Sequence, residues 1–176
     1  MKTRFTLAAV AVGLLLCGCA GMLRSDGPVA MAKLEATRGN AVTGIVMFHQ
    51  QGERVMLHAR VEGLKPGQEH GFHIHEKGDC SSGDGMSTGG HFNPGGKPHG
   101  APDAEHHAGD LPALKADAEG RAEARFTLSG LSIGSGAADI VGKGLIVHAM
   151  PDDYRTQPTG NSGARLACAV ITAGMR

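Results

Sequence analysis

Apolar and polar residues alternate with a period of two over several short segments of the chain. Residues 42–48, for example, place Val42, Val46 and Phe48 on one face. Successive side chains of a strand point to opposite faces, so this pattern predicts strands. The same alternation marks 55–61, 71–76 and 122–128, while 145–150 and 165–172 are apolar and also favour strands. No segment has the sustained apolar stripe of an amphipathic helix.

Turn-forming residues separate these segments. The chain contains 28 glycines, and the Pro66–Gly67 pair marks a turn between two predicted strands. Residues 77–112 form a long Gly/Pro-rich stretch with little strand character. A loop of this length inside a compact domain needs a functional reason. We therefore predict an all-β domain of about eight short strands with one long functional loop.

The N-terminal residues have the composition of an export signal. Lys2 and Arg4 precede an apolar run, Leu7 to Leu16, that is too short to span a bilayer. The run Leu16-Cys17-Gly18-Cys19 resembles a bacterial lipobox, with small Gly18 before the cysteine. Cleavage after Gly18 would leave Cys19 as a diacylated N-terminus. The alternative is an ordinary signal peptide cut near Ala20, and the mature chain leaves the cytosol in both cases.

These features divide the 176 residues into three parts. Residues 1–18 are expected to be a signal peptide with a lipobox, 19–33 a flexible tether, and 34–176 the folded domain. The 17 basic and 17 acidic residues balance and form no basic stripe, which argues against a nucleic-acid partner.

The cysteines fit an exported protein. If Cys17 is removed and Cys19 carries lipid, Cys80 and Cys168 remain. Two cysteines in an exported domain usually pair, so we expect a disulfide.

Histidine is the unusual residue of this composition, with 10 copies, most of them between His70 and His148. Neutral imidazole is the commonest metal ligand in proteins. His73 and His75 stand two apart on a predicted strand, so both rings point to one side and can bind one metal ion. Alone, this pair is a weak signal.

The long loop adds further candidate ligands. Three imidazoles and a carboxylate suit a four-coordinate zinc ion, and the loop supplies them as His91, His99, His107 and Asp110. His148 lies in a predicted apolar strand. By itself it would be interpreted as a hydrogen-bonded core histidine, but beside His73 and His75 we interpret it as a ligand.

Several motifs, in order, are similar to those of the copper–zinc superoxide dismutases. They are GFHIHE at 71–76, GDC at 78–80, GHFNP at 90–94, HAGD at 107–110 and GNSGARLAC at 160–168. The resemblance covers nearly all of residues 40–172. It implies a Greek-key β-sandwich or flattened barrel, an architecture that is known for this enzyme family, here in an exported bacterial lipoprotein form.

The resemblance also implies the role of each residue. Copper would be held by His73, His75, His91 and His148, and zinc by His91, His99, His107 and Asp110, with His91 bridging one copper and one zinc ion per subunit. Cys80 and Cys168 would form the disulfide. Asp152 would link a copper histidine to a zinc histidine, Arg165 would attract the superoxide anion, and Thr159 would narrow the channel opposite it. His106, beside His107, should not bind zinc, because the family pattern has its histidine three residues before the aspartate.

The implied reaction is dismutation of superoxide to dioxygen and hydrogen peroxide, by a redox-cycling copper beside a structural zinc. The catalytic residues would be Arg165 and His91. The chain departs from the family at Pro158, where a charged residue is common, so either the field that steers superoxide is weaker here or another lysine such as Lys97 contributes to it. The segment between Cys80 and His91 is also longer, and a homodimer is left open.

The expected location is the cell envelope, where the protein would be exported to the periplasm and anchored to a membrane through the lipid on Cys19. There it would protect the envelope from superoxide. The alternative is a non-enzymatic periplasmic lipoprotein that binds copper and zinc, which would explain the histidines but not Arg165 or the bridging arrangement.

Overall fold

The computed structural model describes residues 27–174. Within them the chain forms ten strands and one short 3-10 helix, η1. The strands are β1 (Val29–Ala36), β2 (Thr43–Gln51), β3 (Arg54–Glu62), β4 (Glu69–His70), β5 (Phe72–His75), β6 (Leu114–Lys115), β7 (Ala122–Ser129), β8 (Gly144–His148), β9 (Arg165–Val170) and β10 (Thr172–Ala173), and η1 is Met86–Thr88.

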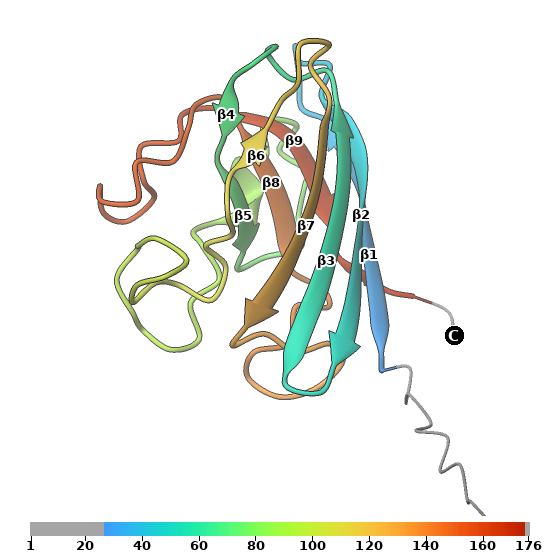
Figure 1. Ribbon diagram of the computed structural model, residues 1–176, viewed down its shortest axis with the longest axis vertical. Coiled ribbons are helices and arrows are strands. Elements are labelled where there is room, and N and C mark those ends of the chain that lie inside the picture. The colour runs from blue at the N-terminus through green and yellow to red at the C-terminus, as the bar shows by residue number, and fades with distance from the viewer. Residues whose placement is uncertain (1–26, 175–176) are drawn as a thin grey trace, which may run out of the picture.

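One curled antiparallel sheet organises the domain (Figure 1). Its strand order is β5-β8-β9-β1-β2-β3-β7, β10 pairs with β1, and β4 and β6 form a separate pair. The sheet bends so that β5, β8 and β9 lie behind β7, β3 and β2 in Figure 1. The predicted all-β fold with a long loop is confirmed.

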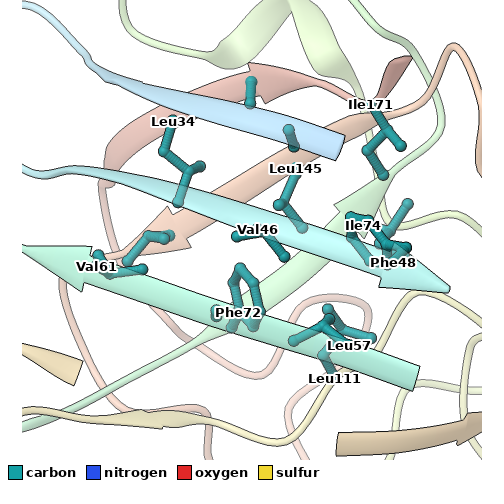
Figure 2. Close-up of a cluster of buried hydrophobic side chains, with 14 of the residues drawn as sticks. Leu34, Val46, Phe48, Leu57, Val61, Phe72, Ile74, Leu111, Leu145 and Ile171 are labelled. Carbon is teal, nitrogen blue, oxygen red and sulfur yellow. The ribbon is translucent and has the colours of Figure 1, made fainter. Parts of the chain in front are cut away.

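The core lies between the two halves of the curled sheet. Phe48 of β2 stands opposite Leu57 of β3, and both are buried. From the other half, β5 contributes Phe72 and Ile74, which point into the same cluster in Figure 2. The predicted alternation therefore places one side of each strand in the core, and burial of these apolar side chains stabilises the sheet.

The folded domain begins earlier than the sequence suggested. The predicted tether, 19–33, was too long, because Val29–Lys33 belong to β1 and pair with β2. The inward side chains there are Ala30 and Ala32, which are too small to give a clear hydrophobic alternation. The signal peptide, the lipobox and Cys19 lie outside the described residues and stay predictions. Within those residues no helix has the length and hydropathy needed to cross a membrane.

The long loop between β5 and β6 is attached to the sheet at several points. A disulfide joins Cys80 to Cys168 of β9, with 6.0 Å between the two Cα atoms. Farther along the loop, Phe92 N donates to Ile74 O and Ile74 N donates to Gly109 O. A Cβ at Gly109 would clash with Ile74 O, so glycine is required there by the close approach of the loop to β5.

Candidate metal centre

Four buried imidazoles meet beside β5. His73, His75, His91 and His148 each offer a ring nitrogen, and these atoms all lie within 4.8 Å of one another. β5 and β8 bring three of the four together, because Ile146 stands opposite His73 and His148 follows Ile146 by two residues. The loop supplies His91 through an isolated bridge to His75. The structure thus assembles the four predicted copper ligands.

Each of these rings has one nitrogen that makes no hydrogen bond. The unpartnered buried atoms are His73 Nδ1, His75 Nε2, His91 Nε2 and His148 Nε2. A buried polar atom without a partner costs about 1–3 kcal/mol. Four such atoms converging on one point are explained if they bind a metal ion, so the donor set fits copper.

The opposite nitrogen of three of these rings is held by the protein. His73 Nε2 donates to Asp152 Oδ2 at 2.6 Å, and His75 Nδ1 donates to Gly89 O at 2.9 Å. His148 Nδ1 is 3.3 Å from Gly163 O. These partners orient each ring and determine which nitrogen is free to bind a metal ion.

Burial keeps His73, His75 and His148 neutral. Loss of solvation lowers the pKa of His73 to about 4. Burial likewise lowers the pKa of His75 and of His148 well below the usual value. A neutral imidazole has the lone pair that a metal requires, so the rings are ready to bind a metal ion at neutral pH.

A second group shares His91 with the first. His91, His99, His107 and Asp110 offer ligand atoms that again lie within 4.8 Å of one another. Asp110 is central: Oδ1 lies 2.7 Å from His91 Nδ1 and 3.2 Å from His107 Nδ1. Three imidazoles around one carboxylate suit zinc, and this set agrees with the predicted zinc ligands.

The charges in this second group are strongly coupled. Burial raises the pKa of Asp110, but the hydrogen bond from His91 and the charge of the neighbouring His99 outweigh it and hold that pKa well below its usual range. Burial also opposes the charged form of His99, but the carboxylates of Asp110 and Asp152 raise its pKa to about 9. His99 Nδ1 is 3.0 Å from Asp110 Oδ2 without a hydrogen bond, which leaves that nitrogen free for a metal ion.

Asp152 joins the two groups from behind. Its Oδ2 accepts from His73 Nε2, and its Oδ1 lies 2.9 Å from His99 Nε2. Gly160 closes over this contact, because a Cβ there would clash with Asp152 Oδ1. Asp152 therefore orients one ring from each group, where the sequence placed it.

The structure separates the two adjacent loop histidines. His107 is buried with its ring against Asp110. His106 is half-buried, its Nδ1 donates to Ala104 O at 2.7 Å, and it belongs to neither group. This geometry agrees with the expectation that His107 alone could bind zinc.

Arg165 lies at the start of β9, half-buried against the loop. Its Nη1 donates to Gly85 O at 2.7 Å and to Thr88 Oγ1 at 2.6 Å, and its Nη2 donates to Gly89 O at 2.8 Å. Burial lowers the pKa of Arg165, yet a guanidinium stays charged at any working pH. The sequence suggested a cation beside the site, but not the three loop contacts.

Two further residues matter that sequence reasoning missed. His70 is buried, and its Nδ1 donates to His148 O at 2.8 Å, which supports the backbone of a candidate ligand. Tyr154 OH accepts from Ala113 N at 3.1 Å, which joins the segment between β8 and β9 to the end of the long loop. Neither residue carries a metal-binding pattern in the sequence. Thr159 is half-buried, and its proposed role in the channel stays a prediction.

Comparison with known proteins points to one family. The profile of the family described as Copper/zinc superoxide dismutase (SODC) matches residues 42–171. Superoxide dismutase [Cu-Zn] 2 of Brassica juncea is 45% identical over 150 residues, which cover 80% of this chain and 95% of that protein. The crystal structure of the clock protein EA4 superposes with a TM-score of 0.76 at 36% identity, covering 84% of this chain and 96% of that one.

Proposed function

Because this chain belongs to the copper/zinc superoxide dismutase family and is an enzyme that takes copper and zinc, we propose a role for each residue of its centre. His73, His75, His91 and His148 hold copper. His91, His99, His107 and Asp110 hold zinc. The carrying observation is the set of four buried ring nitrogens that converge without hydrogen-bond partners, one of which belongs to the ring shared with the second group.

Copper bound there would supply the one-electron exchange by which one superoxide is oxidised to dioxygen and a second, with two protons, is reduced to hydrogen peroxide. His91 can donate a proton in this reaction. Its Nδ1 faces Asp110 at 2.7 Å, while its Nε2 faces the other three histidines without a partner. Nε2 can therefore hold a proton whenever it is not bound to a metal ion and pass it to the reduced substrate.

The remaining residues orient the ligand rings and attract the substrate. Asp152 and Gly89 O fix the rings of His73 and His75. Arg165 also donates to Gly89 O, the carbonyl that orients His75. Its permanent positive charge therefore lies beside the copper ligands, where it favours an anionic substrate. Thr159 faces the substrate path in this proposal.

Dismutation is tested on the full chain loaded with both metals. We expect cyanide-sensitive consumption of superoxide, abolished in His91→Ala and retained in the matched control His106→Ala. A chain that binds both metals without consuming superoxide would instead be the non-enzymatic copper- and zinc-binding lipoprotein.

The proposal extends to the cell envelope. The apolar leader and the Leu16-Cys17-Gly18-Cys19 run support export, lipidation of Cys19 and protection of the envelope from superoxide. An acylated N-terminus with two or more chains anchors stably. Cys19→Ser should move the protein from the detergent-extracted membrane fraction to the soluble one. Wild-type protein found wholly in the soluble fraction would contradict the lipid anchor.

A further inference from the structure

Two methionines and two histidines form a two-by-two block on the outer face of β2 and β3. The antiparallel register sets Met47 opposite His58 and His49 opposite Met56. All four point away from the core, since they alternate along their strands with buried residues such as Phe48. Directly opposed side chains have Cβ atoms about 4.5–5.5 Å apart, so the four surround one point above the sheet.

The block is rich in thioether and open to solvent. Met47 is 45% exposed, and Met31, which pairs with it from β1, is 36% exposed. Three of the five methionines in residues 27–174 therefore share this face. Met47 and His58 also line a hollow of about 720 Å³, through which a ligand can reach these two side chains.

One polar atom of the block has no partner, and two others contact side chains of β7. His49 Nε2 is buried and has no hydrogen-bond partner. Met56 Sδ accepts only a weak bond from Thr127 Oγ1 at 3.2 Å. His58 Nε2 lies 2.9 Å from Glu123 Oε1, whose side chain is half exposed. A metal ion could take the free nitrogen of His49 and displace Thr127 Oγ1 from Met56 and Glu123 Oε1 from His58, two partners that both lie on β7.

This block is separate from the family centre. The histidines of that centre come from β5, β8 and the long loop, whereas β2 and β3 lie at the other end of the strand order, with the core between (Figure 1). No residue is shared between the two groups.

We propose that Met47, His49, Met56 and His58 bind a second copper ion, in the cuprous state, with Met31 at the edge. Thioether sulfur is a soft donor that selects Cu(I), and imidazole completes a four-ligand set of two sulfurs and two nitrogens. Methionine has three rotatable bonds and can turn its sulfur toward the metal without moving the strand. The block contains no thiolate or carboxylate, so it is a poor site for zinc.

The test titrates the full chain, already loaded with copper and zinc, with cuprous ion alone under anaerobic conditions. A chromophoric cuprous chelator competes for the metal. We expect wild type to bind one equivalent more than the Met47→Leu/Met56→Leu variant. Leucine is close to methionine in volume, so this variant should fold. Met86→Leu, an exposed methionine on η1, is the matched control and should keep the extra equivalent.

A structural readout separates this site from adventitious binding. X-ray absorption on the extra copper should show both sulfur and nitrogen ligands in wild type. The full chain also carries Cys17 and Cys19, whose thiols bind cuprous ion, so the difference between wild type and the double variant decides the result. The proposal is overturned if the double variant takes up as much copper as wild type. It is also overturned if wild type shows no copper–sulfur signal that the double substitution removes.

Discussion

Arg165 and His75 donate hydrogen bonds to the same backbone oxygen, that of Gly89. The Arg165 Nη2 bond is 2.8 Å long and the His75 Nδ1 bond 2.9 Å. One carbonyl therefore orients a candidate copper ligand and at the same time holds the guanidinium of Arg165. The disulfide holds this loop to β9, the strand that carries Arg165.

Arg165→Ala should lower the rate of superoxide dismutation severalfold or more at low ionic strength, with both metals still bound. Arg165 is not a metal ligand, and its charge attracts the anion. Arg165→Lys keeps the charge but loses the three-bond fork, so it should recover part of the rate. Rate and metal content are measured on the same samples. An unchanged rate in Arg165→Ala at low salt rules out the electrostatic role.

Asp152→Asn should weaken zinc binding by roughly 10–100-fold, the usual cost of losing a group that orients metal ligands. An amide cannot accept two N–H bonds with the strength of the carboxylate that now joins His73 and His99. Zinc affinity is measured by competition with a chelator. Asp103→Asn, an exposed position of the same loop, is the matched control and should bind zinc as wild type does.

His107→Ala should lose zinc and loosen the loop, whereas His106→Ala should keep its full zinc content. The reason is placement: His107 faces Asp110, and His106 faces Ala104 O at the surface. Metal analysis together with proteolysis of the loop gives the readout. The reverse outcome would mean that the loop binds zinc through a different set of residues, and His99 would then have to be reassigned as well.

Metal-free protein should lose stability as the pH falls below about 6.5, the usual pKa of histidine. The folded state holds the pKa of His73 at about 4 and those of His75 and His148 also low. The unfolded chain therefore binds protons that the folded chain does not bind, so the free energy of unfolding decreases as the pH decreases. Each such ring contributes a slope of about 1.4 kcal/mol per pH unit.

His99 has the opposite sign. Its folded pKa is raised to about 9, so its contribution is complete below pH 6.5 and is lost as the pH rises through 9. Melting of metal-free protein should thus show a maximum near neutral pH. Protein loaded with both metals serves as the control and should be flatter. A melting temperature that stays constant between pH 6.5 and 5 would contradict the burial of neutral rings.

Tyr154→Phe should destabilise the metal-free protein by about 1–3 kcal/mol, because it leaves the backbone N–H of Ala113 without its acceptor. Tyr154 also holds Asp152 through its own backbone N–H at 2.7 Å, in a left-handed conformation with φ 54°. Loss of the hydroxyl should therefore loosen zinc as well. Unfolding must be followed by far-UV circular dichroism, because the wild-type chain has one tyrosine and no tryptophan. A variant as stable as wild type would show that the hydroxyl bond contributes nothing.

Local patterns predicted the strands and the short-range part of the centre. Alternation at 55–61 gave β3, and two-residue spacing placed His73 and His75 on one side of β5. Where the side chains were small, the same reasoning failed: Ala30 and Ala32 hid the start of β1. The sequence also showed four candidate ligands close together in one loop, namely His91, His99, His107 and Asp110.

Long-range pairing was beyond any local pattern. Asp152 reaches His73 across 79 positions, and Arg165 reaches Gly89 across 76. The resemblance to a family suggested roles for Asp152 and Arg165, but not the carbonyl that Arg165 shares with His75. The block on β2 and β3 likewise depends on register, because a shift of one residue would turn Met47 and His49 into the core.

The sequence by itself determined the all-β class, the paired histidines of β5, the histidine-rich loop and the two cysteines that form the disulfide. These are local properties of the chain. Strands and the direction of their side chains can be predicted from neighbouring residues, because a strand has a fixed period of two. The family resemblance suggested that His91 is shared and that Asp152 links the two groups, but only the tertiary structure decided which atoms make these contacts and that four ring nitrogens are left without partners. Those facts arise where the folded sheet and loop bring distant segments within a few ångströms, and burial there removes the water that would otherwise satisfy the nitrogens.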